Sequence, residues 1–331
     1  MKKIKLGLIG LGFIGKTHLR NSLRLANADL IAVSDISKRA LNDAQKLGVK
    51  RAFSNYEELL KDRQLDAVII ALPTHLHLKC AKRAAEDKKH ILLEKPIARN
   101  VAEAKEIVSI AQKNSVKLMI GYPLRFNAIM SNLRGKIKSG VLGDVAIAHA
   151  TYVNPGPFQH REQDYAPTPV PEWWFNKELT GGGALIDLGS HMINLLRWYF
   201  GEIADIKSHL GYRFNLDLED HAICLAKFES GTTAVINVGW FSQEYQLKVE
   251  LLGTVKHAVA QNIPPKRISA AIQMLTMNTT PFWRPFAVEL EYFANCIAND
   301  VRPSPSGNDG LKDLEAIESA YRNSIQLNEI S

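Results

Sequence analysis

The sequence predicts an α/β domain with a doubly wound parallel sheet, followed by an α+β domain with mainly antiparallel strands. Three observations support this fold class. A glycine-rich turn joins an apolar strand to a helix near the N-terminus. Short apolar strands then alternate with helical segments as far as Gly121, which indicates a parallel sheet. Beyond Gly121, strand-like segments follow one another, which indicates antiparallel pairing.

The composition is typical of a globular protein of two domains. The chain has 331 residues, of which 46% are hydrophobic and 23% charged. Its formal net charge of +7 is spread along the chain and forms no arginine–lysine run. We therefore expect an anionic small molecule, such as a dinucleotide or a sugar nucleotide, as a ligand, and no nucleic acid.

The cysteines and the N-terminus bear on the compartment. Cys80, Cys224 and Cys296 are far apart and lack metal-ligand spacing, so we expect reduced thiols, a cytoplasmic protein and no metal site. The apolar run after Met1 contains glycines, ends at Lys16 and has no small-residue cleavage site, which favours a buried strand over a signal peptide. No segment approaches the ~20 apolar residues of a membrane span, and we expect no membrane partner.

The glycine-rich turn has G-x-G-x-x-G spacing in the context that dinucleotide binding requires. A strand over Ile4–Ile9 precedes it, and a helical stretch over Lys16–Leu25 follows. Gly10 permits the tight turn, Gly12 lets the backbone approach a pyrophosphate, and Gly15 lets helix and strand pack closely. The helix N-terminus then directs N–H groups at the phosphates. We expect cofactor contacts from the whole motif, namely Gly10, Gly12, Phe13, Ile14 and Gly15.

An acidic residue follows the second predicted strand, Leu30–Val33. Asp35 lies about twenty residues beyond the last glycine, where a carboxylate binds the ribose hydroxyls of adenosine. Alternatively, it caps the next helix, Ser37–Leu47, and both roles can coexist. A carboxylate there repels a 2′-phosphate and favours NAD, although Lys38 and Arg39 follow closely and would soften that repulsion, so NADP stays open.

The alternation of strands and helices continues to Gly121. The expected elements are a strand over 66–71, a helix to about 87, a strand over 90–93, a helix over 101–113 and a strand over 117–121. Ligands of open α/β sheets bind at the carboxyl ends of strands, so the turn after residue 71 is expected in the cofactor groove. Its candidate residues are Leu72, Pro73, Thr74, His75 and His77. The two histidines lack a third ligand nearby and predict no metal.

The next strand ends at Glu94-Lys95-Pro96. Proline stops a strand, so the last side chains are presented at the carboxyl edge of the sheet. Lys95 supplies a mobile cation that can hydrogen-bond a substrate oxygen. The alternative is an ordinary surface lysine at a strand end.

A helix ending near Gly140 and a strand over 143–153 open the second half. Asn154–Pro171 is then a long polar loop, and loops of this length are usually functional or disordered. The loop contains Arg161 and Tyr165, and the adjacent Trp173-Trp174-Phe175 argues for order because aromatic residues tend to be anchored.

A second polar pair follows Gly181–Gly183. Asp187 and His191 are four residues apart, hence on one face of the predicted helix. A carboxylate that orients a histidine is a general-base arrangement. The alternative is a helix-surface pair of no consequence. The glycine triplet favours the functional interpretation because it would let a ligand approach the helix start.

Strands fill the region 203–261, and helices over 282–298 and 311–327 close the chain. Ser230-Gly231 is a hairpin signal between Ala222–Phe228 and Thr232–Trp240. Both alternating sets of these two strands carry apolar residues. A sheet of this kind needs a cover on both faces, so we expect a homodimer or homotetramer through the sheet.

Together the motifs resemble the glucose–fructose oxidoreductase / inositol dehydrogenase / MocA family, from Lys2 to about Leu327. The resemblance rests on G-x-G-x-x-G, the acid after the second strand, Pro-Thr-His, Glu-Lys-Pro, Tyr-x-x-Arg-Phe, Trp-Trp-Phe and Gly-Gly-Gly-x-Leu-x-Asp-x-Gly-x-His. It implies an NAD(P)-binding Rossmann domain over residues 1–122. It also implies a substrate-binding and oligomerisation domain over 123–331 with an open antiparallel sheet, the C-terminal helix packing back on the first domain.

The resemblance also assigns residues and a reaction. It implies oxidation or reduction of a sugar, polyol or sugar-nucleotide hydroxyl with a nicotinamide cofactor. Lys95, Asp187 and His191 match the catalytic trio, with His191 as the base. Glu94, Lys95 and Arg125 are expected beside the cofactor. The expected substrate contacts are Lys95, Tyr122, Arg161, Tyr165, Trp174, Asp187 and His191. Asn194 stands where many members have an acid, which predicts a different sugar preference.

Two alternatives share this fold. One is a glycosidase that uses NAD for a transient oxidation, and the other is a non-catalytic NAD(P)-binding sensor. The motifs do not distinguish a cyclic polyol from an aldose or a nucleotide-linked amino sugar.

Overall fold

The computed structural model describes residues 3–157, 171–262 and 284–325. The chain forms two compact units: Met1–Pro123 with Trp283–Leu311, and Leu124–Phe282 with Lys312–Ser331. The first unit therefore includes a segment from the range expected for the second domain, and the boundary falls inside a helix near residue 311.

The first unit contains the predicted parallel sheet, which confirms its fold class. All five strand pairs are parallel, and the strand order is β3-β2-β1-β4-β5-β6, the doubly wound arrangement. The strands are β1 (Ile4–Ile9), β2 (Ala28–Ser34), β3 (Arg51–Phe53), β4 (Ala67–Ile70), β5 (His90–Glu94) and β6 (Leu118–Gly121).

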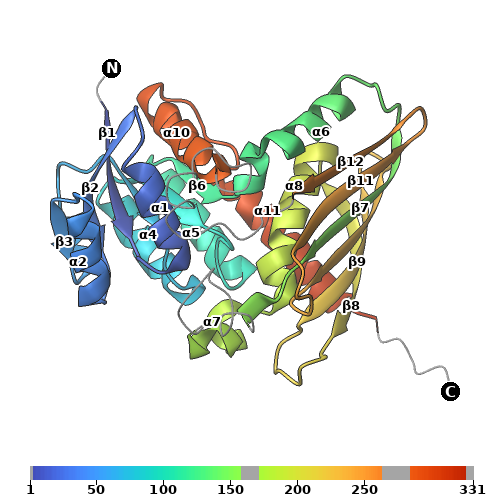
Figure 1. The fold of residues 1–331 in the computed structure, drawn as a ribbon, viewed down its shortest axis with the longest axis horizontal. Coiled ribbons are helices and arrows are strands. Elements are labelled where there is room, and N and C mark those ends of the chain that lie inside the picture. The colour runs from blue at the N-terminus through green and yellow to red at the C-terminus, as the bar shows by residue number, and fades with distance from the viewer. Residues whose placement is uncertain (1–2, 158–170, 263–283, 326–331) are drawn as a thin grey trace. The chain divides into compact units, whose positions relative to one another are not determined.

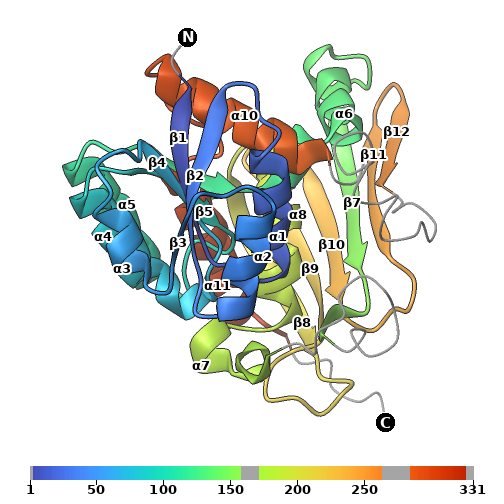
Figure 2. The same cartoon turned by 60° about the vertical axis from the view of Figure 1, so that its left-hand side comes forward.

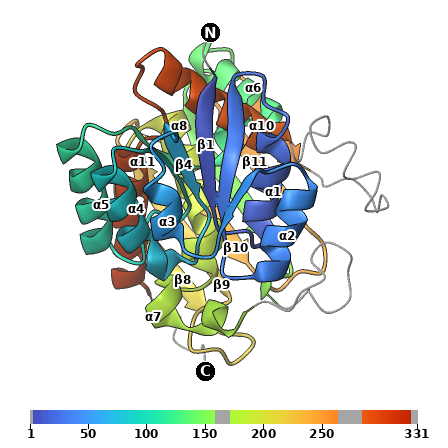
Figure 3. The same cartoon turned by 90° about the vertical axis from the view of Figure 1, so that its left-hand side faces the viewer.

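Helices cover both faces of this sheet, with α1 and α2 on one side and α3, α4 and α5 on the other (Figure 3). They are α1 (Phe13–Ser22), α2 (Lys38–Lys46), α3 (Tyr56–Leu60), η1 (Thr74–Leu76), α4 (His77–Glu86) and α5 (Val101–Lys113). Because both faces are covered, the middle strands are continuously apolar: Val68, Ile69 and Ile70 of β4 are fully buried.

Two details differ from the expectation. Helix α1 begins at Phe13, not Lys16, so Gly15 lies in its first turn. Helix α10 (Arg284–Ala298) belongs to this unit and packs against α1. Figure 2 shows α10 beside the upper part of α1 and β1, and Asn27 donates to the Glu291 carbonyl at 2.9 Å.

The second unit is built on a six-stranded sheet of order β12-β11-β7-β10-β9-β8. Only β7 and β10 pair in parallel, which confirms the mainly antiparallel prediction. The strands are β7 (Val145–Val153), β8 (Ile203–Gly211), β9 (His221–Phe228), β10 (Thr233–Gly239), β11 (Gln246–Gly253) and β12 (His257–Asn262).

One face of this sheet is covered by α6 and α8, as Figure 1 shows. The helical segments are η2 (Pro123–Phe126), α6 (Ala128–Lys138), η4 (Glu172–Phe175), α7 (Lys177–Thr180), η5 (Leu185–Gly189), α8 (Ser190–Phe200) and α11 (Gly307–Arg322), with η2 and α11 crossing the unit boundary. No described helix of this unit covers the other face, where Ile223 is 49% and Leu225 53% exposed.

Four residues, 229–232, lie between β9 and β10, and three of them lie between the hydrogen-bonded Phe228 and Thr232, not the two of the predicted hairpin signal. Phe228 donates to the Thr232 carbonyl at 2.9 Å, and Gly231 has φ +93°. A glycine in the left-handed region closes loops of this length. None of the helices described is long and apolar enough to cross a membrane.

Candidate active site

The three motif glycines of the first unit meet different surroundings. A Cβ on Gly10, whose φ is +94°, would lie 2.3 Å from the Ala71 carbonyl oxygen, and one on Gly15 would lie 2.0 Å from the Gly10 oxygen. A Cβ on Gly12 would meet nothing within 4 Å. Two glycines therefore allow close packing, and the third leaves its backbone accessible, as a phosphate requires.

The N-terminus of α1 suits an anion. Over the described residues no side chain caps it, and its first turn has no acidic residue. The positive end of the helix dipole therefore favours an anion at this position. Phe13 is 56% exposed and Ile14 is half-buried beside it. This loop fits the pyrophosphate of a dinucleotide.

Asp35 is tied to the glycine loop. Its carboxylate accepts the Leu11 N–H at 2.6 Å and the Ser37 N–H at 2.7 Å. The capping alternative is wrong, because Ser37 caps α2 through the Ala40 N–H. Lys38 and Arg39 are exposed in the first turn of α2. The sequence interpretation missed Ile36, an exposed apolar residue at 94% beside this acid, whose only signal was its position.

The turn after β4 is divided between partly exposed and buried residues. Leu72, Pro73 and His75 are half-buried, and Thr74 is buried. Burial, and then the charge of Arg99, lowers the pKa of His75. These four lie where the groove was expected, at the carboxyl end of a central strand.

His77 lies inside the unit. Its Nδ1 is 3.0 Å from the Pro96 carbonyl oxygen and its Nε2 2.9 Å from that of Leu72. Burial lowers the pKa of this imidazole. His77 therefore links the turn after β4 to the bend after Lys95, and its side chain does not lie in an open groove.

Glu94 and Lys95 occupy the carboxyl end of β5, as predicted. Lys95 is half-buried, and its backbone N–H donates to the Glu94 carboxylate at 3.2 Å. The other carboxylate oxygen lies 2.6 Å from Nε2 of His18. Glu94 is only 6% exposed, so its side chain points into the unit.

Asp187 and His191 of the second unit lie on consecutive helical segments. Asp187 is in the π-turn η5 and His191 in the first turn of α8. The Trp240 indole N–H donates to the Asp187 carboxylate at 3.2 Å, and the His191 ring lies 5.8 Å from that of Tyr152. Single π-turns inside helices are rare and frequently occur at functional sites.

The glycine triplet before this π-turn has a packing role. A Cβ on Gly183 would lie 1.9 Å from the Glu219 carbonyl oxygen, and one on Gly182 would lie 2.1 Å from the Tyr321 hydroxyl. The Glu219 carboxylate accepts the Gly183 and Leu185 N–H groups, both at 3.0 Å, and the Tyr321 hydroxyl at 2.7 Å. The prediction that the triplet admits a ligand is therefore wrong at these two positions.

Aromatic rings surround the Asp187–His191 pair. Tyr152 and Tyr245 lie edge to face at 5.6 Å and hydrogen-bond through their side chains. Trp174 lies 6.5 Å from Trp240. Burial raises the pKa of Tyr152 to about 12, so its phenol is neutral. The sequence interpretation missed Tyr152, Trp240 and Tyr245, because single aromatic residues at strand ends carry no distinctive spacing.

Arg125 belongs to a buried network of the second unit. It is 7% exposed and donates to the Asn194 side-chain oxygen at 2.7 Å. The Asn194 amide donates in turn to Asp313 at 2.6 Å, and Asp313 also pairs with Arg197. Asn194 thus bridges two charged groups in the interior, and the carboxylate that balances Arg125 comes from α11.

The remaining predicted residues divide as follows. Tyr122 is 2% exposed within the first unit. Arg161 and Tyr165 lie outside the described residues. The first unit brings together the glycine loop, Asp35 and the Glu94–Lys95 bend, and the second brings together Asp187, His191 and the tryptophans. The described part of the chain has no group of three residues suited to a metal ion.

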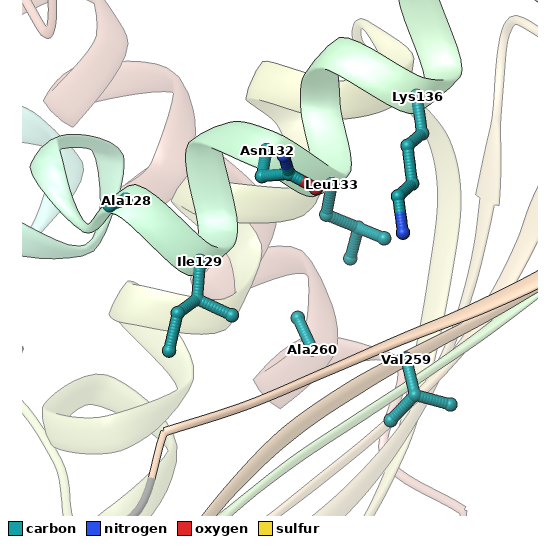
Figure 4. Close-up of a pocket in the computed structure, with 7 residues that line it drawn as sticks. All are labelled: Ala128, Ile129, Asn132, Leu133, Lys136, Val259 and Ala260. Carbon is teal, nitrogen blue, oxygen red and sulfur yellow. The ribbon is translucent and has the colours of Figure 1, made fainter.

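A hollow between α6 and the edge strand β12 contains none of these residues. Figure 4 shows Ile129 and Leu133 pointing from α6 toward Ala260 on β12. Ala260 is 2% exposed, whereas its neighbour Val259 is 52% exposed and points away from the helix. The hollow therefore reflects how α6 covers one face of β12.

Known proteins match both units. Residues 4–122 match the family model described as an oxidoreductase family with an NAD-binding Rossmann fold, and residues 130–258 match a GFO/IDH/MocA C-terminal domain. The chain is similar to myo-inositol 2-dehydrogenase of Thermotoga maritima, at 26% identity over 329 residues covering 94% of this chain and 93% of the relative.

Two further likenesses extend the comparison. D-xylose 1-dehydrogenase (NADP(+)) of Haloarcula marismortui is 27% identical over 317 residues, which cover 90% of this chain and 83% of that protein. The crystal structure of scyllo-inositol dehydrogenase from Lactobacillus casei with NAD(H) and scyllo-inositol superposes with a TM-score of 0.82 at 22% identity, covering 98% of this chain and 97% of that chain. At 22% identity, the likeness to this crystal structure is a likeness of fold.

Proposed function

Because the chain belongs to the GFO/IDH/MocA family of oxidoreductases, whose first domain is an NAD-binding Rossmann fold, we propose that it is a dehydrogenase of sugar or polyol hydroxyl groups. The observation that carries the proposal is the Asp187–His191 pair, placed on a π-turn and the following helix among aromatic side chains. A general base beside flat apolar rings suits a hydroxylated ring with C–H faces.

The proposed chemistry gives a role to the cofactor and to each residue of the trio. When bound, NAD supplies the ring that accepts a hydride from the carbinol carbon. His191 accepts the hydroxyl proton as general base. The Lys95 ammonium hydrogen-bonds the same oxygen and stabilises its developing negative charge. The Asp187 carboxylate favours the cationic form of the imidazole.

NAD is the proposed cofactor, with NADP as a weaker alternative. The Asp35 carboxylate is fixed beside the glycine loop by two backbone N–H groups. In that position it would accept the ribose hydroxyls and repel a 2′-phosphate. The exposed Ile36 side chain offers an apolar surface against which an adenine ring would pack.

Cyclic polyols and aldoses are the proposed substrates, because the named relatives act on inositol and xylose. The test is a panel of inositols, aldoses and sugar nucleotides with NAD and NADP, followed by ultraviolet absorbance of the reduced nicotinamide. Oxidation of one class supports the proposal. Release of sugar from glycosides without net reduction would favour the glycosidase, and no turnover with any compound would favour the sensor.

We also propose a homodimer, or a dimer of dimers, through the uncovered sheet face. Ile223, Leu225 and Ile147 lie on that face and are 49%, 53% and 40% exposed. Large exposed apolar patches on a sheet are usually buried in a partner, and a second copy gives a self-complementary contact.

Light scattering tests the assembly. The expected mass is at least twice the 36.9 kDa of one chain. Leu225→Asp on the sheet face should give one-chain particles, whereas Val255→Asp in the exposed turn after β11, where Val255 is 69% exposed, should not. A wild-type mass of one chain would contradict the proposal.

A further inference from the structure

A buried polar cluster of the first unit includes Glu94, the residue that precedes Lys95. It consists of His18 on α1, Glu94 on β5 and Glu289 on α10. These side chains are 0%, 6% and 0% exposed. Ionisable groups are rarely buried without a structural or functional reason, because their desolvation is costly.

His18 connects two motifs that are far apart in the sequence. Helix α1 starts in the glycine loop, and His18 lies in its second turn. Its Nε2 is 2.6 Å from Oε1 of Glu94, the residue that precedes Lys95. One hydrogen bond thus joins the expected pyrophosphate helix to the end of the strand that presents the lysine.

The Glu94 carboxyl group is fixed in direction. Gly121 of the neighbouring strand β6 lies against it, so that a Cβ there would be 3.0–3.2 Å from three of its atoms. Its second oxygen accepts the Lys95 N–H at 3.2 Å. The carboxyl group therefore bridges the His18 ring and the peptide that carries Lys95.

Glu289 completes the surroundings of this bridge. Burial, and then the charge of Glu94, raises the pKa of Glu289 well above its usual range. Burial therefore favours the neutral acid form of Glu289. Phe286 of the same helix packs edge-on against the His18 ring at 6.0 Å.

Stability alone does not explain the His18–Glu94 pair. Replacing a buried pair of polar or charged groups by well-packed apolar residues is often neutral or stabilising. The neighbouring residues of β5, Ile91, Leu92 and Leu93, show that this unit fills such positions with apolar side chains. The pair instead fixes the direction of one peptide group, the one before the Lys95 side chain.

We propose that His18 and Glu94 are positioning residues that couple dinucleotide binding on α1 to the orientation of Lys95. The inference rests on the proposed dehydrogenase function for its kinetic consequence. The contacts themselves are His18 Nε2 to Glu94 and Glu94 to the Lys95 N–H. A bound dinucleotide that fixes the position of α1 would, through this bridge, also fix the position of Lys95 relative to the substrate oxygen.

The first test is kinetic. His18→Leu removes the ring nitrogen and keeps an apolar volume, so kcat should fall about 10²-fold. The KM for NAD should change less than about threefold. His18→Gln, whose amide N–H can replace Nε2, should restore most of kcat. Ser22→Ala, a buried change on the same helix away from Glu94, should leave both constants unchanged.

Two kinetic outcomes overturn the proposal. One is wild-type kcat in folded His18→Leu. The other is a loss of NAD affinity as large as the loss in kcat/KM, which would make His18 a cofactor contact. Where His18→Leu does not fold, Glu94→Leu serves instead. It keeps a similar volume and removes both acceptor oxygens, so an unchanged kcat in it contradicts the bridge.

The second test does not need turnover. In lysine-labelled protein, the backbone amide resonance of Lys95, assigned through Lys95→Arg, should move when NADH is added. The amide of Lys16 on α1 reports binding in the same spectrum. In His18→Leu, Lys16 should still move and Lys95 should move less than in wild type, whereas His18→Gln should behave as wild type. Equal movement of Lys95 in wild type and His18→Leu overturns the coupling.

This experiment separates the two proposals. If NADH moves Lys16 but no polyol is oxidised, the proposed reaction fails while the coupling is still decided by Lys95. If NADH moves neither resonance in the wild type, the dinucleotide site is not on α1, and the coupling fails with it.

Discussion

The two proposed catalytic side chains are supported in different ways. The strand end before Lys95 has peptides held by Glu94 and His77, which lie within twenty residues of Lys95 in the sequence, while His18 behind Glu94 comes from farther away. His191 lies in the first turn of α8. The glycine triplet that precedes its π-turn is held by Glu219 and Tyr321, which come from elsewhere in the chain. Supports made by neighbouring residues form a readable motif, whereas supports assembled from distant residues do not.

The largest expected effect comes from removing either side chain itself. His191→Ala or Lys95→Met should lower kcat by about 10²–10⁴, because each loses a group that acts on the reacting oxygen. NADH affinity, measured by fluorescence titration, should stay near wild type. His257→Ala on exposed β12 is the control. A near-normal kcat for His191→Ala would remove the general-base assignment.

A pair of glycine substitutions tests the glycine loop before α1 and the glycine triplet before η5. Gly183→Ala should destabilise the protein by several kcal/mol, on the order of other severe core clashes, because its Cβ would lie 1.9 Å from a backbone oxygen. Gly12→Ala, with nothing within 4 Å, should leave the melting temperature unchanged and weaken NADH binding. Thermal unfolding with NADH titration measures both. The reverse assignment of the two effects would contradict the description of both loops.

The buried acid of the first unit predicts a pH effect on stability. The pKa of Glu289 is raised in the folded protein, so its favourable contribution is full below the unfolded value and is lost as pH rises toward the folded value. The free energy of unfolding of wild type should fall by about 1 kcal/mol for each pH unit between the two pKa values. Glu289→Gln has no group that titrates there, so it should not lose this stability. The melting temperature of the variant should therefore rise relative to that of wild type as the pH is raised from about 5 to 8.

A constant difference between the two melting temperatures across that range would show that Glu289 is not held neutral. Glu315→Gln, on α11 outside this cluster, gives the control slope.

The smallest expected effect concerns cofactor choice. Asp35→Ser removes the carboxylate beside the ribose position, so the preference for NAD over NADP should fall about tenfold. The ratio of kcat/KM for the two cofactors measures it. A wild-type preference for NADP would contradict the role given to Asp35.

The sequence predicted the parallel sheet and the glycine loop because their signals are local. Strand length, the G-x-G-x-x-G spacing and Pro96 after Lys95 are each visible within a few residues. The antiparallel sheet followed from consecutive strands and a hairpin signal.

The remainder depends on contacts between distant residues. His18 has no distinctive spacing to Glu94, and Glu219 none to Gly183, so neither link was predicted. The role of the glycine triplet was misassigned for the same reason: a nearby glycine suits a ligand and a packed carbonyl equally well. The bridge that Asn194 makes between Arg125 and Asp313 was not predicted either, because it joins three separate segments, and the link between Asn194 and sugar preference stays a prediction.

The most direct test of the proposed function uses a polyol whose carbinol carbon carries deuterium, incubated with NAD and the full chain. Mass spectrometry should find one deuterium in the reduced cofactor, in equal amount to the ketone formed. His191→Ala should form neither product at a comparable rate. Ketone without label in the cofactor, or cleavage of a glycoside with no reduced cofactor at all, would contradict hydride transfer from a sugar or polyol carbon.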